Sequence, residues 1–197
     1  MNATPPPILW KPSNERIARA NITRFIRLVN QRWNAGVNDS TQLYEWSVRE
    51  PVLFWTGIWE FCGVVGSRGE EPALADGDKM PGARWFPQAR LNYAENLLRR
   101  RDDTDALVFW GEDKVRWRLS WRELHDAVSR TAQALHAAGV GEGDRVAAFM
   151  PNSPDTVIFM LAAASLGAIW SSCSPDFGAR GVLDRFGQIE PKLLFAV

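Results

Sequence analysis

Small hydroxyl residues and one cysteine follow a long apolar run in the stretch SSCSPDFG, residues 171–178. Ser172 or Cys173 could attack a carbonyl, but such a nucleophile needs a neighbouring base and a third group that orients the base. The sequence has no GxSxG motif, and its two histidines, His125 and His136, fall in one predicted helix with no evident reason to approach the stretch. We therefore assign no catalytic residue.

Metal binding and phosphate binding have characteristic residue spacings. His125 and His136 are three helical turns apart and have no carboxylate or cysteine at ligand spacing, so no metal site is predicted. The glycine-rich stretch GVGEGDR, residues 139–145, has Asp144 where a GxGxxG motif would have its last glycine. It also leads from a helix to a strand, whereas phosphate loops lead from a strand to a helix. We interpret it as a helix stop and strand entry.

The position of the hydroxyl-rich stretch is more informative than its nucleophiles. Open α/β sheets bind ligands just beyond the carboxyl ends of their strands. Ser174, Pro175 and Asp176 stand at such an end, because a predicted strand stops at Cys173. Small side chains and a rigid turn would let a ligand approach the backbone there. A plain strand-to-helix turn capped by Asp176 explains the same residues, so the residues alone leave both interpretations open.

The elements that carry this stretch alternate between strands and helices. Strands are predicted over residues 144–150, 168–173 and 192–197, with helices that begin at Pro154, capped by Ser153, and at Gly181. Such alternation is typical of an α/β fold with a parallel sheet and right-handed crossovers. Material to cover the third strand is missing, which indicates the first βαβαβ units of a larger, incomplete domain.

A hairpin and a capped helix precede these strands. The hairpin is predicted over residues 105–121 with its turn near Gly111, Val115, Trp117 and Leu119 on one face, and Arg116 and Arg118 on the other. Interleaved Arg and Trp also occur in RNA-binding platforms, but one half-buried strand explains the pattern. Ser120 and Glu123 form a capping box that starts a helix, and Gly139 ends that helix.

The predicted domains are residues 1–103, a helical and extended region, and residues 104–197, the start of the sheet domain. One amphipathic helix is expected over residues 13–33. Its apolar stripe is Ile17, Phe25, Leu28 and Val29. The remaining expectations are a helix that starts at Pro51, a loop or extended wrap over 66–87, and a short helix in 91–100 with Leu91, Leu97 and Leu98 inward.

The totals exclude several classes of protein. Lysine plus arginine and aspartate plus glutamate both number 23, a balance that argues against nucleic-acid binding. The two cysteines form no CxxC pair and the N-terminus has no signal-peptide pattern, so a cytoplasmic protein is expected. Residues 156–175 carry no charge over a length that could span a bilayer, but their serines and Gly167 favour a buried helix, turn and strand, with no membrane partner.

Four stretches are informative when taken together: LYEWSVREPVLFW, MPGARWFPQARLNYAENLLRR, GVGEGDRVAAFMPNSPDTV and SLGAIWSSCSPDFGARGVLDRFGQIEPKLL. They resemble the acetoacetyl-CoA synthetases, which are adenylate-forming acyl-CoA ligases, and the resemblance covers nearly the whole chain. It implies that Ser174, Pro175 and Asp176 lie where the related acetyl-CoA enzymes hold the nucleotide of CoA with a glycine-rich turn. These three residues are the candidate cofactor-binding site.

The resemblance also implies a reaction and its cofactors. ATP, with Mg²⁺, would adenylate acetoacetate and release diphosphate, and the thiol of CoA would then displace AMP. The SGTTGxPKG-type phosphate loop and the C-terminal lysine of the family do not occur in the 197 residues. The resemblance therefore implies the N-terminal part of a ligase, inactive without the rest of the ligase chain. Two alternatives stay open: a naturally truncated module that binds CoA or pairs with a full-length ligase, and part of an acetyl- or short-chain acyl-CoA synthetase.

Overall fold

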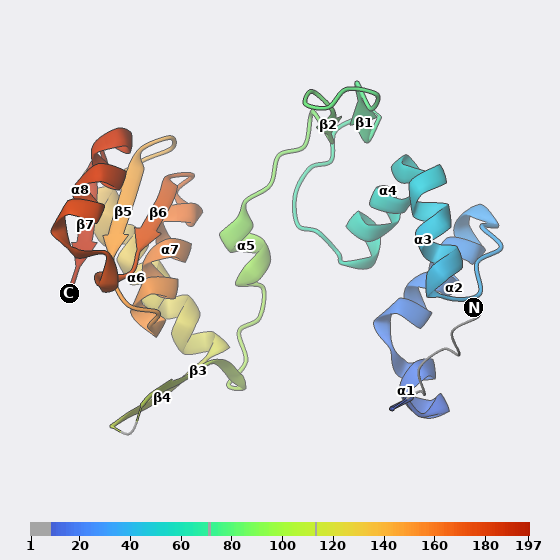
Figure 1. Cartoon of the computed structure of the whole chain (residues 1–197), viewed down its shortest axis with the longest axis horizontal. Helices are drawn as coiled ribbons and strands as arrows, with labels where there is room; N and C mark the ends of the chain where they lie inside the picture. Colours follow the sequence, from blue (N-terminus) through green and yellow to red (C-terminus); the bar gives the residue numbers. More distant parts are fainter. Residues whose placement is uncertain (1–8, 71, 113) are drawn as a thin grey trace, which may run out of the picture. The chain divides into compact units, whose positions relative to one another are not determined.

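A computed structural model describes residues 9–70, 72–112 and 114–197. These residues form two compact units that divide between Ala89 and Arg90. The N-terminal unit contains α1 (Asn14–Arg19), α2 (Asn21–Trp33), α3 (Ser40–Arg49), α4 (Pro51–Phe61) and two very short strands, β1 (Leu74–Ala75) and β2 (Arg84–Trp85) (Figure 1). Pro51 occupies the first turn of α4, as predicted, and the region 66–87 is mostly loop.

The prediction of a single helix over residues 13–33 is wrong, because the helix is interrupted at Ala20. Ala20 has an extended backbone, with φ −65° and ψ 143°, and separates α1 from α2. The hydroxyl of Thr23 donates to the carbonyl of Ile17 at 2.6 Å, which satisfies a carbonyl at the end of α1. Ile17 is 41% exposed rather than part of the apolar stripe, since α1 buries no residue. Phe25 and Val29 are buried as predicted.

Aromatic rings build the core of the N-terminal unit. The Phe25 ring meets the rings of Phe54 and Phe61 edge to face, at centroid distances of 5.7 and 5.3 Å. Gly57 on α4 leaves the space that these rings need, because a Cβ there would lie 3.1 Å from Trp33 and 3.2 Å from Phe25. The core therefore depends on ring packing between helices.

The C-terminal unit is α/β, as predicted. Its elements are α5 (Tyr93–Leu97), β3 (Asp105–Gly111), β4 (Val115–Ser120), α6 (Trp121–Ala137), β5 (Arg145–Phe149), α7 (Pro154–Ser165), β6 (Ile169–Cys173), the short 3₁₀ helix η1 (Pro175–Phe177), α8 (Gly178–Ile189) and β7 (Leu193–Ala196). The parallel sheet has the order β6-β5-β7, with β5 in the middle, and β3 pairs antiparallel with β4 (Figure 1).

Local signals explain where these elements begin and end. The capping box is present: the Glu123 N–H donates to the Ser120 hydroxyl at 3.2 Å, and the Ser120 N–H donates to the Glu123 carboxylate at 2.8 Å. Gly139, just after α6, has φ 83°, which suits glycine. The uncharged run forms α7, a turn at Gly167 and β6. No helix in the described ranges combines the length and apolar character needed to cross a bilayer.

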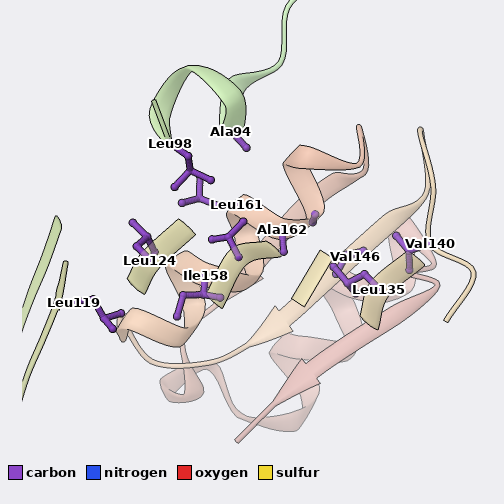
Figure 2. Close-up of a cluster of buried hydrophobic side chains, with 12 residues drawn as sticks. Ala94, Leu98, Leu119, Leu124, Leu135, Val140, Val146, Ile158, Leu161 and Ala162 are labelled. Atoms are coloured by element: carbon purple, nitrogen blue, oxygen red, sulfur yellow. The ribbon is translucent and has the colours of Figure 1, made fainter. Parts of the chain in front are cut away.

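One face of the sheet is covered by α6 and α7, and α5 lies over α7 in turn. Figure 2 shows Ala94 of α5 and Leu98, the residue that follows α5, beside Leu161 of α7, all fully or almost fully buried. Leu91 and Leu97, predicted to point inward, are exposed. The reason is that Asn92 caps α5 and sets its start, so the inward positions are residues 94 and 98, one helical turn apart.

The packing of α5 bears on the predicted domain boundary. The domain boundary expected between residues 103 and 104 stays a prediction. In the structure, however, α5 belongs to the compact unit that contains the sheet. Asn92 reinforces this arrangement, because its side-chain amide donates to the carbonyl of Ala164 at 2.9 Å at the end of α7.

The opposite face of the sheet is covered by α8. Along β5, Val146 faces α7 whereas Ala147 packs with Cys173 and with Phe186 of α8. Leu183, predicted to point inward, is 72% exposed. Val182, Phe186 and Ile189 repeat at helical spacing and turn Leu183 toward solvent, while they pack on the sheet. The connections that follow β5 and β6 therefore leave the sheet toward opposite faces.

Candidate functional site

The candidate site lies at the carboxyl edge of the parallel sheet. Strands β5 and β6 pair from Arg145↔Ile169 to Phe149↔Cys173, so both end at the same edge. The Met150 N–H donates to the Cys173 carbonyl at 3.2 Å just past the last pair. Beyond this hydrogen bond, the connections that follow β5 and β6 diverge, the first toward α7 and the second toward α8. In open α/β sheets, such a point of separation is where ligands bind.

Ser174, Pro175 and Asp176 are brought together in one turn after β6. The Ser174 hydroxyl donates to the Asp176 carboxylate at 2.8 Å and accepts from the Asp176 N–H at 3.4 Å. Pro175 begins the 3₁₀ helix η1. Ser174, rather than Asp176, is thus the capping residue, so the interpretation of Asp176 as a cap is wrong. The Asp176 carboxylate is exposed and can accept further hydrogen bonds from a ligand.

The turn continues into α8 through a glycine that its conformation requires. Gly178 has φ 62°, and a Cβ at this position would meet no atom within 4 Å. The glycine is therefore needed for the left-handed backbone and leaves the approach to the turn open. The guanidinium of Arg185 lies 4.0 Å over the exposed ring of Phe177. The sequence interpretation missed this pair, although a spacing of eight residues, about two helical turns, could have indicated it.

The connection after β5 forms the other side of the edge. Thr156 in the first turn of α7 donates its hydroxyl to the Pro151 carbonyl at 2.7 Å. Ser153 occupies the N-cap position of α7, as predicted, and its hydroxyl lies 3.3 Å from that of Thr156. These bonds hold the connection close to the start of α7 and leave Asn152 exposed.

The possible nucleophiles and metal ligands are placed as follows. Cys173 is buried in an apolar cluster with Ala147 and Phe186, the environment of a packed core residue. His125 lies on α6 beside Asp126, with Nδ1 3.3 Å from the carboxylate, and His136 is exposed on the same helix. Within the described ranges, no three side chains of His, Cys, Asp or Glu are grouped to hold a metal.

The glycine-rich stretch 139–145 lies at the amino end of β5, away from the candidate site. Lys192 donates to the Gly139 carbonyl at 2.5 Å and to the Asp144 carboxylate at 2.8 Å. The Lys192 ammonium, followed by the Gly141 N–H, lowers the pKa of the Asp144 carboxyl. The stretch thus ends α6, starts β5 and holds β7 beside it, which confirms its interpretation as a helix stop and strand entry.

Comparisons with known proteins agree with this arrangement. The family model described as AMP-binding enzyme matches residues 94–197, and the model described as acetyl-coenzyme A synthetase N-terminus matches residues 40–97. The acetoacetyl-coenzyme A synthetase of Rhizobium meliloti (strain 1021) is 57% identical over 94% of this chain and 28% of its own length. The acetoacetyl-CoA synthetase of Danio rerio is 42% identical over 96% of this chain and 28% of its own.

A solved structure extends the likeness to the fold. The acetoacetyl-CoA synthetase from Streptomyces lividans matches with a TM-score of 0.90 and 43% identity, over 97% of this chain and 30% of that one. The chain thus spans less than a third of the length of these relatives. More than half of it, including the whole parallel sheet, lies within the first of the two matched families. The chain therefore belongs to the AMP-binding enzyme family.

Proposed function

We propose that residues 1–197 form the N-terminal part of an ATP-dependent acetoacetate–CoA ligase. The observation that carries this proposal is the high identity, along almost the whole chain, with proteins named acetoacetyl-CoA synthetase. The proposed substrates are acetoacetate, ATP and CoA. The carboxylate of acetoacetate attacks the α-phosphate of ATP and diphosphate leaves. The CoA thiol, losing its proton, then attacks the acyl carbon and AMP leaves.

The contribution we assign to this chain is the turn after β6. Ser174, Pro175 and Asp176 are proposed to contact the nucleotide of CoA. The exposed Asp176 carboxylate, oriented by the Ser174 hydroxyl, can accept a hydrogen bond from an amino or hydroxyl group of that nucleotide. Mg²⁺ would offset charge on the phosphates of ATP. No three side chains of His, Cys, Asp or Glu are grouped to hold it among the described residues, so we assign it no residue here.

A chimeric enzyme tests the proposed activity. Residues 1–197 would replace the matching segment of the Rhizobium meliloti relative, and the release of diphosphate and formation of the acyl-CoA would be measured with acetoacetate and with acetate. We expect the chimera to be active and to prefer acetoacetate. The chain alone should form no acyl-adenylate. A folded chimera without activity toward either acid would contradict the proposal, whereas a preference for acetate would favour the acetyl-CoA synthetase alternative.

Calorimetric titration of CoA into the active chimera tests the site. Replacing Asp176 with Ala should weaken CoA binding by about ten- to a hundredfold, because one hydrogen bond to a charged group contributes about 1.5–3 kcal/mol. The matched control is Asp184→Ala, an exposed carboxylate on α8. Equal CoA affinity in the two variants would contradict the proposed contact between Asp176 and CoA. Heat from CoA binding to the 197-residue chain alone would instead support the CoA-binding module.

We also propose that the ligase acts in the cytoplasm. Cys62 and Cys173 are far apart in the sequence and form no CxxC pair, so the sequence has no sign of a disulfide framework, which is typical of a reducing compartment. Fractionation of cells that express the tagged chimera tests this proposal. Recovery with a cytoplasmic marker is expected, and recovery with secreted or membrane fractions would contradict it.

A further inference from the structure

The β3–β4 ribbon presents two chemically different faces. Its register places Leu107 opposite Leu119, Phe109 opposite Trp117 and Gly111 opposite Val115. Residues that are directly opposed in an antiparallel pair share a face. Every side chain on this first face is therefore apolar, and we call it the apolar ribbon face; it consists of Leu107, Phe109, Val115, Trp117 and Leu119.

The apolar ribbon face is covered only at its inner end. Leu119 is 8% exposed and belongs to the core of the C-terminal unit, whereas Trp117 is 37% and Val115 53% exposed. A Cβ at Gly111 would lie 3.2 Å from the Phe109 ring, so this glycine makes room for the ring on the same face. The hydrophobic surface thus continues from the core onto a ribbon that projects away from the parallel sheet (Figure 1).

The second face of the ribbon already has its polar groups paired. The Arg116 guanidinium lies 4.6 Å over the ring of Trp110, which covers one side of that ring with a charge. Arg118 pairs with Asp105 across the strands. Val108 and Trp110 also lie on this face and are 50% and 64% exposed, so its apolar side chains stand beside charged ones. The two faces therefore differ in charge: the second carries arginine side chains, whereas the apolar ribbon face carries none.

An uncovered apolar ribbon face indicates a partner. Two-stranded ribbons are at best marginally stable alone, and contiguous apolar surface marks an interaction site. A hollow of about 370 Å³ lies on the ribbon and is lined from both faces, by Phe109 and Trp117 of the apolar ribbon face and by Trp110, Arg116 and Arg118 of the second face. The relatives supply a candidate occupant, since this chain matches only 28% of their length.

We propose that the apolar ribbon face is the docking surface for an apolar segment of the polypeptide that completes the ligase. The proposal rests on the proposed function, because it takes the occupant from the remainder of such a ligase. It also assigns the two tryptophans different roles: Trp117 is covered by the docked segment, whereas Trp110 and its Arg116 neighbour stay in water.

Hydroxyl-radical footprinting compares the two tryptophans directly. The oxidation rates of Trp117 and Trp110 would be measured by tandem mass spectrometry in the 197-residue chain and in the Rhizobium meliloti chimera. We expect oxidation of Trp117 to fall roughly fivefold or more in the chimera and that of Trp110 to change less than about twofold. Unchanged oxidation of Trp117, or protection of Trp110 alone, would overturn the proposal.

Two substitutions in the chimera provide a second measurement. Trp117→Thr should lower the melting temperature clearly more than Trp110→Thr, and equal shifts would argue against docking on the apolar ribbon face. Neither measurement requires activity, so a folded but inactive chimera contradicts the ligase proposal and still tests the docking surface. A chimera that fails to fold counts against docking. If Trp117 is protected in a dimer of the 197-residue chain alone, a second copy is the occupant and the proposal is wrong.

Discussion

The two compact units of the chain bury their hydrophobic side chains by different physical means. In the N-terminal unit, helices meet through large rings, with Phe25 between Phe54 and Phe61. In the C-terminal unit, small side chains such as Ala147 and Ala162 lie between a sheet and its helices. Backbone pairing fixes the strands of the second unit, whereas the first depends on the orientation of each ring. We therefore expect the first unit to be the more sensitive to changes of side-chain shape.

Loss of one ring gives the largest expected effect. Phe25→Ala should destabilise the N-terminal unit by about 3–5 kcal/mol, because it removes both edge-to-face contacts and leaves a cavity. Urea unfolding followed by near-ultraviolet circular dichroism measures the change. Ile22→Ala on the same helix is the control, since Ile22 is exposed and its loss should cost far less. Equal costs would contradict the ring-based account of this core.

A pair of glycine substitutions compares the units directly. Gly57→Val should destabilise the N-terminal unit by about 1–3 kcal/mol, because the added atoms would press on Trp33 and Phe25. Gly187→Ala in α8 should instead stabilise the C-terminal unit by about 0.5–1 kcal/mol, since no atom lies within 4 Å of the new Cβ. Thermal melts of both variants measure the signs. Stability changes of the same sign in both variants would contradict the expected difference between the units.

The C-terminal unit should respond more to its capping bonds. Asn92→Ala should cost about 1 kcal/mol, because Asn92 accepts from the Glu95 N–H and donates to the end of α7. Asn92→Asp keeps the acceptor but loses the donor, so its stability should fall between those of the wild type and the Ala variant. Denaturant unfolding measures all three proteins. No loss in the Ala variant would show that α5 is held by Ala94 and Leu98 alone.

The smallest expected effect depends on pH. The ammonium of Lys192 lowers the pKa of Asp144, so their pairing stabilises the fold above the unfolded pKa of about 3.9 and the stabilisation is lost as pH falls through the lower folded value. Asp144→Asn should therefore be less stable than the wild type near neutral pH and approach it in acid. Melting temperatures between about pH 2 and 7 check this. A constant difference would rule out the ion pair as its cause.

Sequence patterns predicted the C-terminal unit better than the N-terminal one. The reason is again that the C-terminal unit depends on local backbone signals and the N-terminal unit on side-chain packing. Strand alternation, the Ser120 capping box and the proline at the start of α7 are local signals, and the structure confirms each of them. The break at Ala20 has no such signal, because it depends on a hydroxyl three residues further on and on packing around α2. The prediction that Leu183 points inward was wrong for a related reason. Helical spacing alone does not show which face of the helix packs on the sheet.

The candidate site could be predicted in position but not in detail. The strand that ends at Cys173 placed the turn at Ser174 correctly, since parallel strands end together at one edge. The hydrogen bond that makes Ser174 the cap was not predictable, because serine and aspartate both cap short helices. The partial cover of Trp117 was also missed, since alternation shows which residues share a face but not how far the core extends along it.

The packing of α5 has a consequence for exchanging segments between related AMP-binding enzymes. Ala94 and Leu98 cover Leu161, and Asn92 holds the end of the same helix. A crossover placed at residue 104, just before the first strand, would bring in foreign side chains over an unchanged Leu161. Recombination upstream of Asn92 keeps these partners together, so the unit that can be inherited as one piece begins with a short helix rather than with a strand.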